Sequence, residues 1–406
     1  MRLTAAIFTL LILFGAAVLG PAAGGYTMVT TLPQSGGCPQ FDRWNLSIST
    51  PLNRRWSTTL PSSQTILTAA AQGSAAQLDE IEQTISASFG AWSGVTGSML
   101  NTAAHPDTIA PLERTTDANA CTNDSEGNAD GLNTICFDQS STAFSSGVLA
   151  FTRVITANAA GVTVGASAPS EFAGQILDAD TLVRGDSQYI FATPAALSTA
   201  QGQGAYDLES ILTHEIGHWL GLGHSAVIRA MMFPFSPPPG TYLGLRPTAN
   251  SPDGPLADDD RTVLRSMYPD AADTVNIGTI SGQVLPANPF ALAALPSPAP
   301  GQSLTGIFGA HVVAVDADTG AVVAGVLAGW SCNAAGTPAQ FDGSFSIQRL
   351  PVGRNYMIYA EPLTGIATPG NFSDVLGGLC ATSGSGSCHV PQVNTNFNVT
   401  TLMNPQ

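Results

Sequence analysis

The eleven residues HEIGHWLGLGH, which begin at His214 and end at His224, decide what this chain can build. On a helix, positions i and i+4 lie on one face, so His214 and His218 can share a metal ion while Glu215 lies beside it. Gly221 tolerates a positive φ, so the helix can end there and the chain can turn His224 back as a third ligand. Three neutral imidazoles leave one position of a tetrahedral zinc open, which is typical of a catalytic site.

The full pattern HExxHxxGxxH is the long metzincin signature, and it uses three of the six histidines in the chain. The segment HSAVIRAMMFP follows, and it carries Met232 eight positions after His224, with Pro234 close behind. It resembles the Met-turn of the matrixins, the metzincin subfamily of matrix-metallopeptidase type. The resemblance implies that Met232 forms a hydrophobic floor under the metal and is not a ligand. Ordinary core packing is the alternative for a thioether side chain.

A third match is LADDDRTVLRSMYP, which runs from Leu256 to Pro269. Three aspartates lie at the positive N-terminal end of a predicted helix, and Pro269 follows its end. The segment is similar to the last helix of a matrixin catalytic domain, where an acidic pair opens the helix. The helix dipole alone explains an acidic first turn equally well.

The chain also departs from the matrixin pattern. Ser236 stands where a tyrosine often lines the pocket for the side chain beyond the scissile bond, so the side-chain preference is not carried over. The histidines of the second, structural zinc site of the animal enzymes are missing, because His105, His311 and His389 are isolated in sequence. We therefore expect one catalytic zinc.

Helical and strand patterns extend the resemblance over residues 38–270, although it is strong only from Asp207 onward. Ser74 and Gln77 form a capping-box pattern before apolar residues at helical spacing, and Asp207 can cap the metal-binding helix. The expected fold is α+β: a metzincin catalytic domain with a twisted mixed sheet and three main helices. The predicted strands lie around Leu46 and within residues 132–137, 148–157 and 174–183.

Residues 276–406 lose helical periodicity and alternate in short strands with Asp-Gly and Asp-Ala-Asp-Thr-Gly turns. This predicts a small all-β sandwich. The series resembles the carboxypeptidase regulatory-like, transthyretin-like modules, which implies stability or binding and no chemistry. The stretch from Pro286 to Gln302 is either a long loop in this domain or a flexible spacer.

The N-terminus indicates export. Arg2 precedes an apolar run and then small residues, which predicts a signal peptide over residues 1–24 and a secreted protein, extracellular or periplasmic. No other segment is long and apolar enough to span a bilayer, so we expect no membrane association after cleavage. The formal net charge of −16 argues against nucleic acid as a partner. The sequence says nothing about oligomeric state.

Six cysteines in an exported chain favour disulfides over thiol chemistry. The local pairings that we expect are Cys121 with Cys136 and Cys380 with Cys388, which leaves Cys38 and Cys332. Six cysteines allow fifteen connectivities, so the pairing stays open. A disulfide is also the expected fate of Cys38, in preference to a latency switch on the zinc.

We interpret the sequence as that of a secreted zinc endopeptidase that acts on protein or peptide substrates. The zinc would activate a bound water, and Glu215 would be the general base. The alternative is a secreted binding or adhesion protein whose metal domain is mainly a scaffold. The matrixin resemblance also implies structural calcium, for which Asp178 and Asp180 offer oxygen ligands, with a solvated acidic loop as the alternative.

Overall fold

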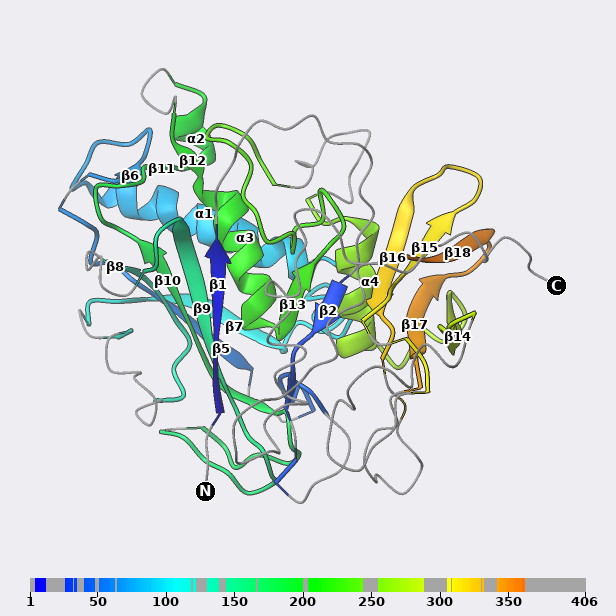
Figure 1. Ribbon diagram of the computed structural model, residues 1–406. Helices are drawn as coiled ribbons and strands as arrows, with labels where there is room; N and C mark the ends of the chain where they lie inside the picture. Colours follow the sequence, from blue (N-terminus) through cyan, green and yellow to red (C-terminus); the bar gives the residue numbers. More distant parts are fainter. Residues whose placement is uncertain are drawn as a thin grey trace. The chain divides into compact units, whose positions relative to one another are not determined.

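The computed structural model describes one strand near the N-terminus and most of the chain from residue 26 to residue 361 (Figure 1). The described ranges are 4–11, 26–31, 33–34, 40–47, 51–62, 64–117, 120–121, 130–138, 144–165, 167–199, 204–243, 255–287, 305–307, 309–329, 331 and 342–361.

Among the described strands, the largest sheet contains six, and they run in both directions. In spatial order they are β1 (Thr4–Leu11), β9 (Val148–Thr156), β10 (Ile176–Arg184), β8 (Thr134–Asp138), β5 (Leu52–Ser57) and β7 (Ile109–Thr115). The pairings from β10 through β8 and β5 to β7 are parallel, whereas β9 is antiparallel to both β10 and β1. Every residue of β10 is buried, as expected for a strand covered on both faces. The predicted mixed sheet is therefore confirmed.

The strand predicted around Leu46 is wrong. Asn45 turns the chain there, because its side-chain oxygen accepts hydrogen bonds from both the amide and the hydroxyl of Ser47, the amide at 3.2 Å. A local side-chain bond of this kind competes with strand pairing. The strand of this region begins only at Leu52, in β5.

The helix predicted from the apolar spacing after Ser74 is confirmed as α1 (Ala75–Ser93). The Gln77 amide donates to Ser74 Oγ at 3.1 Å, whereas the Gln77 side chain accepts from the amide of Gly73 at 2.7 Å. The other helices in the described part of the chain are α2 (Pro194–Leu197), α3 (Leu208–Trp219) and α4 (Asp258–Met267). Among the helices of the described part, none combines the length and the apolar character that a membrane span requires.

Helices α1 and α3 pack on each other, and α3 packs against β9 and β10 (Figure 1). Two tryptophan side chains hold α3 in place by hydrogen bonds to its backbone. Trp92 of α1 donates its Nε1–H to the carbonyl of Thr213 at 2.8 Å, and Trp44 donates to the carbonyl of Trp219 at 2.9 Å. Both indoles are buried, so each donor is satisfied while its ring fills the core. The metal-binding helix is thus held to the sheet by packing and by directed hydrogen bonds.

Short sheets complete the first part of the chain. One contains β12 (Tyr206–Asp207), β11 (Phe191–Ala192) and β6 (Ile66–Leu67), all parallel. The others are the antiparallel pairs β13 (Leu222–Ser225) with β2 (Tyr26–Met28) and β3 (Thr30–Thr31) with β4 (Gln40–Phe41).

In the described residues after α4 the chain forms five strands, as the alternating pattern predicts. The antiparallel pair is β14 (Ile277–Gln283) with β17 (Ser344–Pro351), and the three-stranded sheet has the order β16 (Val322–Leu327), β15 (His311–Asp316), β18 (Tyr356–Glu361). In the predicted turn after β15, Asp316 Oδ1 accepts the amides of Asp318 and Thr319, and Gly320 has a φ of 73°. The assembly of these strands into a sandwich stays a prediction.

Contacts within the chain divide it into two compact units. The first comprises Met1–Ala17, Arg43–Gly221 and Pro234–Leu256, and the second comprises Val18–Asp42, Leu222–Phe233 and Ala257–Gln406. Helix α4 belongs to the second unit, where it packs against β16 and β17. The leader at 1–24 and the domains 38–270 and 276–406 stay predictions of the sequence, and the grouping of α4 with later strands is a feature that the sequence did not indicate.

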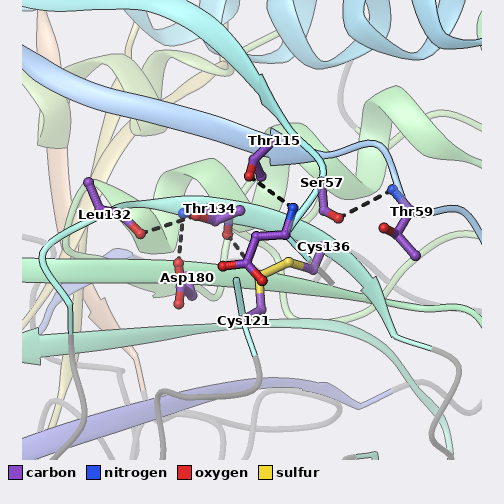
Figure 2. Close-up of a disulfide and its surroundings, with 9 residues drawn as sticks. Ser57, Thr59, Thr115, Cys121, Leu132, Thr134, Cys136 and Asp180 are labelled. Atoms are coloured by element: carbon purple, nitrogen blue, oxygen red, sulfur yellow. Dashed lines mark hydrogen bonds between the residues drawn. A yellow bond between two sulfur atoms is a disulfide. The ribbon is translucent and has the colours of Figure 1, made fainter. Parts of the chain in front are cut away.

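The predicted disulfide between Cys121 and Cys136 is present, with a Cα–Cα distance of 6.2 Å (Figure 2). Cys136 lies on β8, so the bridge ties the segment before β8 to the large sheet. The other four cysteines lie outside the described residues.

Candidate metal centre

Helix α3 begins as the sequence predicts. The Asp207 side chain accepts the amide of Ser210 at 3.1 Å and so caps the helix that carries His214 and His218. Both imidazoles are fully buried, with ring centroids 4.8 Å apart and planes at 86°. One turn of helix therefore brings two ligand-type side chains together on one face.

The third histidine joins them because the helix ends at the predicted place. Gly221 has a φ of 91°, a conformation that a residue with a Cβ rarely adopts, and β13 begins immediately after it. In that strand His224 is also buried. One ligand atom from each of His214, His218 and His224 lies within 4.8 Å of the others, so the three side chains could hold a metal ion.

Glu215 is held by the neighbouring strand. The Thr152 hydroxyl on β9 lies 2.8 Å from Glu215 Oε2 and 3.0 Å from the Glu215 carbonyl oxygen, and it donates to these acceptors. The other carboxylate oxygen, Oε1, is buried and has no hydrogen-bond partner among the described residues. Burial raises the pKa of Glu215 to about 8, and the hydrogen bond from Thr152 opposes this rise. One oxygen is therefore anchored and the other is available for chemistry.

Met232 is fully buried, and both its backbone carbonyl and its backbone amide form hydrogen bonds. Its carbonyl accepts the amide of Ser225 at 2.7 Å, and its amide donates to Asp260 Oδ1 at 3.1 Å. The second oxygen of Asp260 accepts the amides of Met231 and Ala257, each at 2.8 Å. The acidic first turn of α4 therefore holds the loop that carries Met232, which the helix dipole alone would not require.

The two calcium candidates have structural partners. On β10, Asp178 Oδ2 accepts the amide of Gly131 at 2.7 Å and Asp180 Oδ1 accepts the amide of Thr134 at 2.6 Å (Figure 2 shows the latter). Both carboxylates are buried, and among the described residues the three histidines are the one group of side chains placed to hold a metal ion together. Calcium at Asp178 and Asp180 stays a prediction, and their observed contacts fasten the chain before β8 to the sheet.

The other described histidines are not part of the three-histidine group. His311 on β15 is buried, and its Nδ1 lies 2.9 Å from Glu361 Oε1. Burial lowers the pKa of His311, against the influence of Glu361. His389 lies outside the described residues. One metal site remains the expectation.

The sequence predicted neither the contact of Thr152 with Glu215 nor the hydrogen bonds that the aspartates of α4 accept. Thr152 lies in a predicted strand, but nothing in the sequence connects it with Glu215, which is 63 positions away. Asp259 and Asp260 were expected only to open a helix. Their complete burial is unusual for carboxylates and needs nearby donors, a signal that appears only once the fold is known.

Comparisons with known proteins point to one family. Residues 144–268 match the family model described as Matrixin. Metalloendoproteinase 1 of Glycine max is 44% identical over 64 residues, which cover 16% of this chain and 17% of that protein. Metalloendoproteinase 1-MMP of Arabidopsis thaliana is 37% identical over 94 residues, or 21% of this chain and 23% of that protein. Metalloendoproteinase 5-MMP of the same plant is 71% identical over 28 residues, or 7% and 8% of the two chains.

This chain thus spans less than a quarter of the length of each of these relatives. The matched segment contains all three clustered histidines, Glu215, Met232 and α4. Residues 144–268 are therefore similar to the matrixins, and the similarity falls on the residues that build the candidate metal centre.

Proposed function

We propose that this chain is a secreted, zinc-dependent endopeptidase that hydrolyses peptide bonds of protein substrates. The observation that carries the proposal is the buried group of three histidines within 4.8 Å, beside a glutamate with one anchored and one available oxygen. The match of residues 144–268 to the matrixin model supports it. Secretion is part of the proposal and rests on the predicted leader at residues 1–24.

The donor set fits zinc. His214, His218 and His224 would supply three nitrogen ligands, which is the ligand count of catalytic zinc sites that keep one position open. Bound there, zinc would polarise a scissile carbonyl and lower the pKa of water toward ~7. Its charge would also lower the pKa of the adjacent Glu215, because an opposite charge favours the ionised carboxyl.

Glu215 would act as the general base. Thr152 fixes Oε2, so Oε1 is the oxygen that would take a proton from the attacking water and pass it to the leaving amine. The anchoring bond comes from the sheet, whereas Glu215 lies on α3. The packing of α3 on β9 therefore sets the position of the base.

An extended peptide is the substrate form that the sheet favours. Strand β1 pairs antiparallel with β9, from Thr4 opposite Thr156 to Leu11 opposite Val148. Residues 4–11 belong to the predicted leader, so its removal would leave β9 as an edge strand able to pair with a substrate backbone. Because Thr152 on β9 contacts Glu215, this edge passes the proposed base.

The test is cleavage of a denatured protein by the zinc-loaded chain, with and without a chelator. Glu215→Ala should keep one zinc per chain while cleavage falls at least ~10²-fold, the lower range for a positioned general base. Glu209→Ala is the matched control, because Glu209 lies on the same helix with its carboxylate near Tyr242, at 3.4 Å.

Full activity in zinc-loaded Glu215→Ala would overturn the assignment of the base. A wild-type chain that binds zinc and cleaves no peptide under any tested condition would favour the alternative, a binding or adhesion protein with a metal-bearing scaffold.

A further inference from the structure

Asp259 is a fully buried carboxylate in the first turn of α4. Its Oδ2 accepts the hydroxyl of Ser225 at 2.7 Å, and its Oδ1 accepts the amide of Gly325 at 2.9 Å. One side chain therefore joins three elements of the second unit: α4, the end of β13 and strand β16.

Ser225 is the residue after His224, and it is fixed in several directions. Its amide donates to the Met232 carbonyl at 2.7 Å, and its Oγ accepts the amide of Val227 at 3.0 Å. The hydroxyl proton is then used on Asp259. Because the amide and the hydroxyl of Ser225 are both hydrogen-bonded, the backbone next to His224 is held in place.

The partner on the other side of Asp259 comes from outside the matrixin-like segment. Gly325 lies well beyond residue 268, on β16, which is an edge strand of the sheet β16-β15-β18. The outward amide of an edge strand has no ladder partner within its sheet. The Asp259 carboxylate accepts a hydrogen bond from the Gly325 amide. On the same helix, Thr262 Oγ1 lies 3.5 Å from the carbonyl oxygen of Val323, which is also on β16.

A buried carboxylate is stable only when donors replace the water that it has lost. For Asp259 the described donors are Ser225 and Gly325. Loss of either donor would leave one buried oxygen without its hydrogen bond, which destabilises this arrangement. The carboxylate, and with it Ser225, therefore depends on β16 for its position.

We propose that strand β16 is a working part of the metal site, because its Gly325 amide positions Asp259 and Asp259 in turn holds the backbone that presents His224. Asp259 is thus a positioning residue and touches no metal itself. The inference rests on the proposed function only in taking zinc as the ion held by the three histidines.

The experiment measures zinc affinity of the full-length chain by competition with a chromophoric chelator, and stability by urea unfolding of the zinc-free protein. Asp259→Ala should weaken zinc binding about tenfold, the lower range for residues that support metal ligands indirectly. Asp259→Asn keeps the shape and can bond both partners, so it should restore most of the affinity. Thr262→Ala is the matched control, because it removes another contact between α4 and β16 without reaching Ser225.

A merely structural role predicts that affinity follows stability in all variants alike. Our inference predicts that Asp259→Ala loses affinity while Thr262→Ala retains it. If Asp259→Ala does not fold, Ser225→Ala takes its place, because it breaks the same connection at the other end and should also lose affinity. Wild-type affinity in a folded Asp259→Ala or Ser225→Ala chain would overturn the inference and leave the proposed function intact. Absence of zinc binding in the wild type would instead overturn the proposed function, and this inference with it.

Discussion

Replacement of Thr152 by valine is the sharpest test of how the sheet serves the proposed base. Valine keeps the shape of threonine and exchanges the hydroxyl for a methyl group. The hydroxyl lies 2.8 Å from Glu215 Oε2 and 2.9 Å from Thr181 Oγ1, and all three residues are fully buried. The substitution therefore removes the one described anchor of the Glu215 side chain together with the hydroxyl contact to Thr181.

The expected magnitude follows from the charge of the acceptor. A hydrogen bond to a charged group is worth ~1.5 to 3 kcal/mol. If that energy is lost from the transition state, kcat/KM should fall about 10- to 100-fold, because ~1.4 kcal/mol corresponds to a tenfold change in rate. The three histidines are untouched, so zinc content should stay at one per chain.

The assay is steady-state cleavage of a fluorogenic peptide by zinc-loaded protein, with metal content measured on the same sample. Thr152→Ser retains the hydroxyl and should recover most of the activity. Thr181→Val removes the neighbouring hydroxyl bond and spares Glu215, so it should cost ~1 kcal/mol of stability with little change in rate.

Two results would refute the reasoning. Thr152→Val with wild-type kcat/KM would show that the anchor does not matter to the base. A loss of zinc that matched the loss of rate would show that Thr152 acts on the metal centre and not on Glu215.

Three further predictions concern stability. Burial raises the pKa of Asp42 from 3.8 to about 7. The stabilising contribution of this carboxyl is therefore present below pH ~4 and is lost as the pH rises through about 7. In urea unfolding, Asp42→Asn should be more stable than the wild type by up to ~4 kcal/mol at pH 8 and by little at pH 4. Replacing Cys121 and Cys136 by serine opens a loop with a sequence separation of 15 and should cost ~3 kcal/mol while zinc binding persists, and unchanged unfolding would contradict this. Zinc at 1,000 times its dissociation constant should stabilise the chain by ~4 kcal/mol, and His224→Ala should abolish that gain in thermal unfolding.

The sequence by itself determined the local features of this protein. Helical periodicity put His214 and His218 on one face, and a glycine at position 221 allowed the turn that returns His224. Capping by Asp207 and the helix after Ser74 were also predictable. These features depend on neighbours a few positions apart, for which backbone geometry and side-chain type suffice. The strand predicted around Leu46 failed because a local bond from Asn45 overrode a weak apolar pattern.

The tertiary structure decided which distant groups support that local pattern. Thr152 meets Glu215 because α3 packs on β9, and Asp259 meets Gly325 because α4 packs on β16. Hydrogen bonds need their atoms within about 3 Å and well aligned, a condition set by how elements pack and not by spacing along the chain. The residues that can hold the metal were therefore readable in the sequence, whereas the contacts that position them became visible only in the folded protein.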